Sequence, residues 1–454
     1  MSGRNLLPLL VLLCCWLLPA ASSSASASAA TGRSLAEPIF GGFFYLTEAG
    51  VENPELLLLI HGIGDEAGLS WDDSLPGLAD RYHVLLPDLP GFGRSSKGNQ
   101  LYSPENYAAF IDWLLRRYPG RPVTLVGHSL GGAIALAYAG RYGQDLKQLI
   151  LVDSVGVLNR VTISKTFIQD YLNFSFPYFP ASSDGFLDRL AGRVVEKFSR
   201  LSTNLNEVLT SATGRERVLG SEPAKIAGFA LVETDFTSIL AGVSTPTWLI
   251  WGEQDAIAER RIALLLQGLL PQAELKLLPG LGHSPMRENP ALFAQALDAA
   301  LATQPQPPPR PRPPAGERIG SCQGQSGMTF SGNYQRLEIS NCTEVTIEDA
   351  YIGEATIDRS LVSMRNSVIA GEETGLFIRA STLIATAVEI SGRTALVTDQ
   401  CRLDLAGAKL VGRERAVLSQ RETSTLVFSV SEVSSNERRR PLHEVVVLAP
   451  GDSL

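Results

Sequence analysis

Residues 123–132 read VTLVGHSLGG, and residues 133–139 continue as AIALAYA. Apolar and β-branched residues thus lead into a Gly-x-Ser-x-Gly motif, and good helix formers follow it. A strand, a tight turn and a helix are the setting in which this motif presents a nucleophilic serine. We therefore predict that Ser129 has a strained backbone conformation and that the first N–H groups of the following helix lie beside it.

Glycines stand on both sides of this serine. A Cβ at Gly127 or Gly131 would collide with the neighbouring strand and helix, so the turn requires glycine at both positions. The alternative to a nucleophile is an ordinary glycine-rich turn between a strand and a helix of a parallel sheet.

The composition is that of a globular protein. The chain has 454 residues, which suits two or three domains. Hydrophobic residues make up 44% and charged residues 19%. The formal net charge of −8 argues against nucleic acid as a partner, and otherwise it bears on solubility rather than on fold.

The N-terminus has the pattern of an export signal. Arg4 supplies a positive charge, residues 6–18 are apolar, and a run of small residues follows. The apolar stretch is shorter than the about 20 residues that a membrane-spanning helix needs. We predict a signal peptide over residues 1–25, a disordered Ser/Ala segment over 26–35, and a periplasmic, cell-surface or secreted location. An uncleaved anchor is the alternative, so membrane association stays open.

Residues 36–303 alternate between short apolar runs and helical patterns. Such alternation predicts an α/β fold with a doubly wound, mostly parallel sheet. The predicted strands are residues 39–46, 55–60, 83–88, 123–126, 146–152, 246–251 and 274–278, and the predicted helices include 106–118 and 290–303.

The alternation stops between about residues 155 and 244. An insertion of this length is too long for a simple connection, and its helical patterns predict a mostly helical cap over the carboxyl ends of the strands. The cap contains an aromatic cluster that either lines an apolar substrate pocket or forms the core of the cap itself. Its members are Phe174, Phe176, Tyr178 and Phe179.

A proline-rich linker over residues 304–316 follows, and its polyproline II tendency predicts a stiff spacer. A ligand for a proline-binding domain is the alternative. From residue 317 to 454 the pattern is all β, with strands that begin at residues 337, 355, 376, 395 and 416. A period of about 20 residues predicts a β-solenoid, most simply a short parallel β-helix. A β-sandwich is the alternative.

Three cysteines remain after the signal segment, and export would permit a disulfide bond. Cys322 and Cys342 lie one repeat apart, so stacked coils could bring them together; otherwise they are two buried thiols. Cys401 has no evident partner.

The serine needs a base, and the chain has only five histidines. His83 lies in a strand, His128 is the variable position of the serine motif, and His443 is in the C-terminal tail. His61 follows an early strand. His283 lies in a loop between a late strand and the final helix, where a base is expected, and is therefore our candidate.

Two aspartates are candidates for the acid that orients the base. Asp255 follows the strand at 246–251, and Asp153 follows the strand at 146–152. Asp255 gives the chain order Ser, Asp, His and is preferred, with Asp153 as the second choice and Glu253 a weaker neighbour.

A tetrahedral intermediate needs two N–H donors for its oxyanion. Leu130 follows the nucleophile and supplies one, and Ile63 in the loop that reads HGIG at 61–64 is placed to supply the other.

Five segments together resemble the α/β-hydrolase fold family over about residues 36–302. They are HGIG at 61–64, DLPGFG at 88–93, GHSLG at 127–131, WGEQD at 251–255 and GH at 282–283. The chain is most similar to capped esterases, monoacylglycerol lipases and carbon–carbon bond hydrolases of that family. The resemblance implies Ser129 as nucleophile, His283 as base, Asp255 as acid, and the N–H groups of Ile63 and Leu130 as oxyanion hole.

The serine at the motif differs from the aspartate of epoxide hydrolases and haloalkane dehalogenases, and the pattern of proline iminopeptidases is absent. The repeat domain has no counterpart in the usual family, which leaves the substrate open.

These observations predict an exported serine hydrolase that cleaves a small-molecule or lipid carboxylic ester with an apolar acyl side. No metal or organic cofactor is implied. One alternative is a carbon–carbon bond hydrolase with the same triad. Another is a binding protein whose β domain holds a polysaccharide or cell-surface ligand, and the β domain could equally be only a structural appendage.

Overall fold

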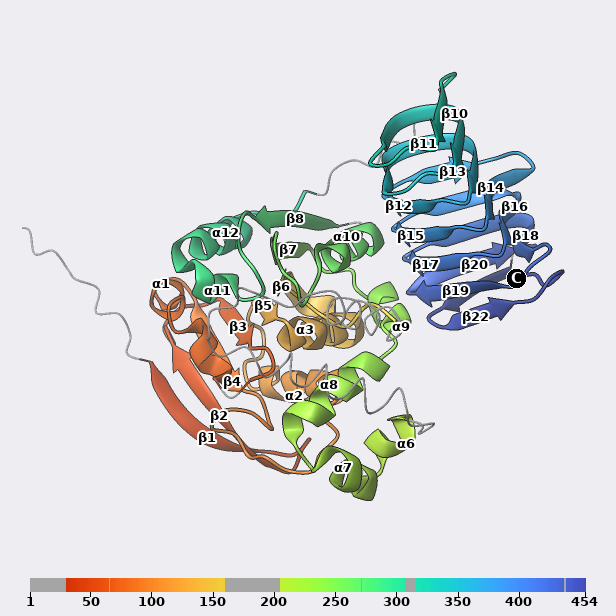
Figure 1. The fold of residues 1–454 in the computed structure, drawn as a ribbon. Coiled ribbons are helices and arrows are strands. Elements are labelled where there is room, and N and C mark those ends of the chain that lie inside the picture. The colour runs from red at the N-terminus through yellow and green to blue at the C-terminus, as the bar shows by residue number, and fades with distance from the viewer. Residues whose placement is uncertain (1–29, 65, 160–204, 271, 307–315, 437) are drawn as a thin grey trace, which may run out of the picture.

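The computed structural model describes residues 30–64, 66–159, 205–270, 272–306, 316–436 and 438–454. They form an α/β domain and an all-β domain that lie side by side (Figure 1). The predicted signal peptide and most of the proline-rich linker lie outside the described residues.

The first domain is built on a sheet of eight strands in the order β1-β2-β4-β3-β5-β6-β7-β8. Strands β3 to β8 run parallel, whereas β2 pairs antiparallel with both β1 and β4. This confirms the predicted mostly parallel α/β sheet. The strands are β1 (Thr31–Glu37), β2 (Gly42–Ala49), β3 (Leu56–Ile60), β4 (His83–Asp88), β5 (Val123–His128), β6 (Leu146–Val152), β7 (Thr247–Gly252) and β8 (Ala273–Leu278).

Strand β1 corrects one prediction. Residues 31–35 were expected to be disordered, but they pair antiparallel with β2 as the edge strand of the sheet. Their Ser-rich composition gives no strand signal, and the free edge of β2 supplies the hydrogen bonds that order them.

Helices cover both faces of the sheet. Leu56, Leu58 and Ile60 of β3 face one apolar core, and Leu57 and Leu59 face the other. The first core includes α2, α3 and α10, and the second includes α1 and α12. The helices of this domain are η1 (Ala67–Trp71), α1 (Leu75–Ala79), α2 (Pro104–Leu115), α3 (Leu130–Tyr142), η2 (Gly143–Asp145), α6 (Leu205–Thr210), α7 (Ala212–Leu219), α8 (Pro223–Glu233), α9 (Thr237–Ala241), α10 (Arg260–Leu269), α11 (Pro285–Glu288) and α12 (Pro290–Ala302).

The described part of the insertion between β6 and β7 contains the helices α6 to α9, the helical content expected of a cap. The four aromatic residues predicted to line a substrate pocket lie in 160–204, outside the described residues. Within the described ranges, no helix is both long enough and apolar enough to span a membrane.

The second domain is all β, as predicted. Its strands are β9 (Ile319–Gln323), β10 (Thr329–Ser340), β11 (Val345–Asp358), β12 (Leu361–Arg365), β13 (Val368–Ala370), β14 (Thr374–Arg379), β15 (Thr382–Thr386), β16 (Glu389–Asp399), β17 (Arg402–Ala406), β18 (Lys409–Ser419), β19 (Ser424–Ser429), β20 (Ser431–Ser435), β21 (Arg438–Leu442) and β22 (Val445–Leu448).

Each repeat of this domain stacks on the one before it. One column of apolar residues shows the stacking, because each of its members lies opposite the next in a pair of parallel strands. The column is Val345, Val362, Leu383, Leu403 and Leu426, and all five are buried in one core. The stack is visible in Figure 1 from β10 to β19. Successive strands stack in parallel register, as a parallel β-helix requires, and the β-helix stays our prediction for this domain. At the end of the stack, β21 pairs antiparallel with β20, and β22 pairs antiparallel with β19.

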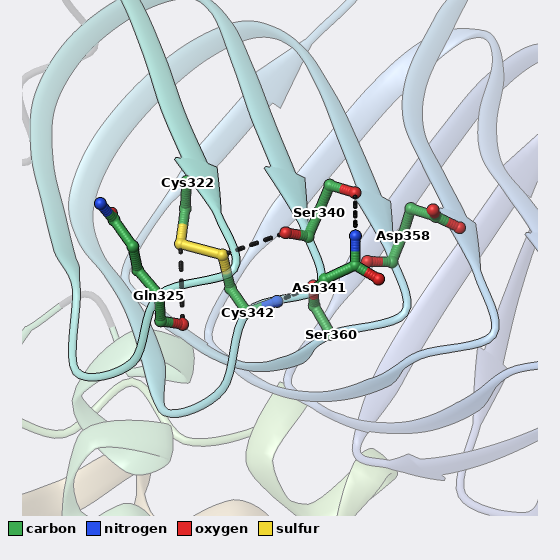
Figure 2. The surroundings of a disulfide bond; sticks show 7 residues. All are labelled: Cys322, Gln325, Ser340, Asn341, Cys342, Asp358 and Ser360. Atoms are coloured by element: carbon green, nitrogen blue, oxygen red, sulfur yellow. Dashed lines mark hydrogen bonds between the residues drawn. A yellow bond between two sulfur atoms is a disulfide. The ribbon is translucent and has the colours of Figure 1, made fainter.

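Cys322 and Cys342 form a disulfide bond between adjacent coils (Figure 2). Cys342 follows β10, and its N–H donates to the Ser360 hydroxyl of the next coil at 2.9 Å. Cys401 is a buried free thiol. Of the two possibilities that the repeat spacing left open, the structure thus has the disulfide rather than two buried thiols.

The two domains are in direct contact through α10. Arg261 forms a bidentate ion pair with Asp404 of β17, with N···O distances of 2.7 and 3.0 Å, and its Nε donates to the hydroxyl of Thr386 at 2.8 Å. Gly407 lies so close to Leu265 that an added Cβ would come within 2.5 Å of its side chain. The β domain is thus packed against α10 of the first domain rather than joined to that domain by the linker alone.

Candidate active site

Ser129 lies at the turn between β5 and α3, in the conformation that the motif predicts. Its φ of 53° and ψ of −118° are strained for a residue other than glycine. A Cβ at Gly127 would lie 2.3 Å from the carbonyl oxygen of Gly131, and one at Gly131 would lie 2.3 Å from that of Ile60. Both glycines are therefore required by the close approach of the backbone, as expected.

His283 reaches the serine from the loop between β8 and α11. Its Nε2 is 2.9 Å from the Ser129 Oγ, and its Nδ1 is 2.8 Å from the Asp255 Oδ2. With the proton on Nδ1 donated to the carboxylate, Nε2 is free to accept the serine proton. The structure thus brings together three residues that the sequence analysis selected from distant segments.

Asp255 is held by the turn after β7. Its Oδ1 accepts the N–H groups of Ile257 at 2.7 Å and Ala258 at 2.9 Å, so that Oδ2 points to His283. The two other candidate acids do not occupy this position: Glu253 is exposed, and among the described residues Asp153 is hydrogen-bonded to the Gly252 N–H at 2.8 Å, not to His283.

The loop after β3 passes directly beside the serine. A Cβ at Gly62 would lie 3.0 Å from the Ser129 Cβ, so a larger residue there would press on the nucleophile. Leu130 is the first residue of α3, and Ile63 follows Gly62 in the loop. Leu130 is thus adjacent to the serine in the chain, Ile63 follows the loop residue that lies beside it, and their role as oxyanion-hole donors stays a prediction.

His61 fixes this loop. Its ring accepts the N–H of Leu89 at 2.9 Å and donates to the carbonyl of Gly62 at 2.6 Å. Burial lowers the pKa of His61 to about 4, so the ring is neutral at pH 7 and serves as one donor and one acceptor. The sequence analysis gave His61 no role, because its partner after β4 is remote in sequence.

His128 fixes the loop that carries the base. Its Nε2–H donates to the backbone carbonyl of His283 at 2.7 Å, and the two rings lie 5.0 Å apart. Burial, and then the adjacent His283, lower the pKa of His128 to about 3. A neutral His128 therefore holds the base without placing a second positive charge beside it. The sequence analysis treated this position as variable and missed the contact.

The hydrogen bonds from Asp255 through His283 to Ser129 form a continuous chain. In the described part of the chain, no cluster of three or more His, Cys, Asp or Glu side chains could hold a metal ion.

Comparison with known proteins places the match in the first domain. The family model described as alpha/beta hydrolase fold matches residues 55–290. Lipase 1 of Psychrobacter immobilis is 31% identical over 242 residues, which cover 52% of this chain and 73% of that protein. The pimeloyl-[acyl-carrier protein] methyl ester esterase of Klebsiella pneumoniae is 30% identical over 258 residues, covering 55% of this chain and 93% of that enzyme.

Among solved structures, an esterase from Thermogutta terrifontis covers 60% of this chain and 98% of its own, with 23% identity and a TM-score of 0.44. The family match ends at residue 290, before the β domain begins.

Proposed function

The chain belongs to the α/β-hydrolase fold family and is a hydrolase, and from that premise we propose that it is a serine hydrolase that cleaves a carboxylic ester. The observation that carries the proposal is the line of hydrogen bonds from Asp255 through His283 to Ser129, at 2.8 and 2.9 Å. The names of the lipase and the methyl ester esterase among its relatives support an ester as substrate.

In the first half of the reaction, the Ser129 oxygen attacks the ester carbonyl while His283 Nε2 takes its proton. The carbonyl oxygen becomes an oxyanion and accepts hydrogen bonds from the N–H groups of Leu130 and Ile63. The tetrahedral intermediate then expels the alcohol, which takes the proton from His283, and the acyl group stays on the serine.

In the second half, His283 takes a proton from water, and the resulting hydroxide attacks the acyl-enzyme. Collapse of the second tetrahedral intermediate releases the carboxylic acid, and the proton returns from His283 to the Ser129 oxygen. Asp255 keeps the imidazole in one tautomer and stabilises its protonated form in both halves.

We also propose that the protein is exported to the periplasm, the cell surface or the medium. The signal-like residues 1–25 and the Cys322–Cys342 disulfide support this location, because disulfides persist in oxidising compartments. Fractionation of cells that express the full chain, with sequencing of the mature N-terminus, tests it. Recovery of the uncleaved chain in the cytosol would contradict it.

A fluorophosphonate probe tests the activated serine without knowledge of the substrate. We expect the probe to label Ser129, as mapped by mass spectrometry, and p-nitrophenyl esters to be hydrolysed. Ser129→Ala should abolish both signals. Ser154→Ala is the matched control, because its buried hydroxyl has no hydrogen-bond partner among the described residues and its removal should leave labelling intact. Equal turnover by wild type and Ser129→Ala would refute the proposal.

A further inference from the structure

A second carboxyl group lies behind the proposed acid. Asp153 follows β6 directly, with a φ of 43°, and it is completely buried. Its Oδ1 accepts the N–H of Gly252 at 2.8 Å. Its Oδ2 is also buried, and no N–H or O–H group of the described residues donates to it. A buried ionised oxygen without a donor is costly, so this oxygen requires an explanation.

The neighbouring Asp255 has room for one more donor. A carboxylate offers about four lone-pair sites. Three of them accept hydrogen bonds from Ile257, Ala258 and His283. The turn after β7 joins the two carboxyls, because Gly252 donates to Asp153 while its carbonyl accepts the N–H of Asp255.

The surroundings favour a proton on Asp153. Burial raises its pKa well above the usual value, the nearby Asp255 charge raises it further, and the Gly252 N–H opposes them. Two adjacent buried carboxylates do not both ionise, and Asp255 is the one that faces His283.

We propose that Asp153 is a positioning residue that keeps its proton and donates it to Asp255 in a hydrogen bond, so that one negative charge faces His283. The inference rests on the proposed triad. The donor fills the last site of the Asp255 carboxylate, fixes its plane and reduces its negative charge toward the imidazole. Loss of the donor therefore strengthens the pull of Asp255 on the His283 proton and raises the pH at which the base becomes active.

Two substitutions distinguish a protonated Asp153 that donates a hydrogen bond from an ionised Asp153. In Asp153→Asn, the amide oxygen can still accept from Gly252 and the amide nitrogen can donate to Asp255. We expect kcat/KM for a p-nitrophenyl ester within about threefold of wild type and an unchanged acid limb of the pH profile. In Asp153→Ala the donor is lost, and the acid limb should move upward by roughly half to one pH unit.

Infrared difference spectra provide a readout that does not depend on activity. Wild type minus Asp153→Asn at pH 7 should show the C=O stretch of a protonated carboxyl, which is well separated from carboxylate bands. A missing band, a loss of activity in Asp153→Asn as deep as in Asp255→Asn, or an unmoved acid limb in a folded Asp153→Ala would overturn the inference. Failure of the triad itself would instead appear as turnover by Ser129→Ala, whatever Asp153 does.

Discussion

The ion pair of Arg261 and Asp404 is one of the contacts between the two domains, and Asp404→Ala tests how much it contributes. The two side chains retain only 16% and 23% exposure. Arg261 is the second residue of α10, and the substitution would leave its guanidinium with the Thr386 hydroxyl and the Ala385 carbonyl as acceptors. The charge would then be largely buried and only partly satisfied.

The size of the effect follows from these contacts. Removing one partner of a fully buried pair costs about 3–5 kcal/mol, whereas an exposed pair contributes about 0–1 kcal/mol. With the partial exposure and the two remaining acceptors of Arg261, we expect a loss of about 2–3 kcal/mol of docking free energy. This corresponds to a factor of about 30–150 in the docking equilibrium.

The sequence supplies a convenient assay. Tryptophans occur at positions 71, 113, 248 and 251 of the hydrolase domain, and none occurs in residues 317–454. During urea unfolding, tryptophan fluorescence therefore follows the unfolding of the first domain, and far-UV circular dichroism follows the unfolding of both domains. In wild type the two transitions should coincide, and in Asp404→Ala they should separate, with a lower fluorescence midpoint.

Glu354→Ala is the matched control. It removes the same charge from an ion pair with Arg336 that lies within the β domain and is about half exposed on both sides. We expect its midpoints to stay near those of wild type. If Asp404→Ala also leaves both midpoints unchanged, the contact does not couple the domains and the reasoning fails.

Three further outcomes are expected. Gly62→Ala places a Cβ 3.0 Å from that of Ser129 and should lower kcat about 10–100-fold in ester hydrolysis, and an unchanged kcat would contradict the close approach. His128 is neutral in the folded state down to about pH 3, whereas the unfolded chain binds a proton below about pH 6.5, so this group costs stability as the pH falls through that window. Between pH 6 and 4, urea unfolding of His128→Gln should therefore be less pH-dependent than that of wild type by about 1.4 kcal/mol per pH unit, and parallel curves would speak against a neutral His128. The Cys322–Cys342 bond closes a loop with a sequence separation of 20, so the double variant Cys322→Ser, Cys342→Ser should lose about 2–4 kcal/mol of unfolding free energy, measured by circular dichroism. In the unfolded wild type, a free-thiol titration should find the thiols of Cys322 and Cys342 unreactive.

The residues of the proposed triad could be selected from sequence because each has a local signature. Ser129 lies in a motif whose glycines are required by close backbone contacts. The chain has only five histidines, so few residues were candidates for the base. Asp255 was preferred over Asp153 by chain order alone, and the hydrogen bond to His283 supports that preference. The all-β texture of the second domain was equally visible, because its apolar residues recur at the spacing of the stacked coils.

Other features depend on contacts that no local pattern records. His128 holds the carbonyl of a residue 155 positions later, and Arg261 finds Asp404 after 143 positions. The edge strand β1 is ordered by β2 and not by its own Ser-rich composition. These features arise from tertiary packing, which decides the outcome where intrinsic propensity is weak.

The position of the docking contact affects how the role of the β domain can be established. Arg261 lies in the first turn of α10, and that helix follows the turn that holds Asp255, so the β domain contacts the element that comes next in the chain after the proposed acid. Asn159, close to the start of the cap insertion, also donates its N–H to the Ser429 hydroxyl of the β domain at 2.8 Å. Removal of residues 317–454 would uncover Leu265 and Leu269 of α10 and leave Arg261 unpaired. A loss of ester turnover after such a deletion would therefore follow from the hydrolase domain's own packing, and a substrate-binding role requires variants on the far coils that leave this contact intact.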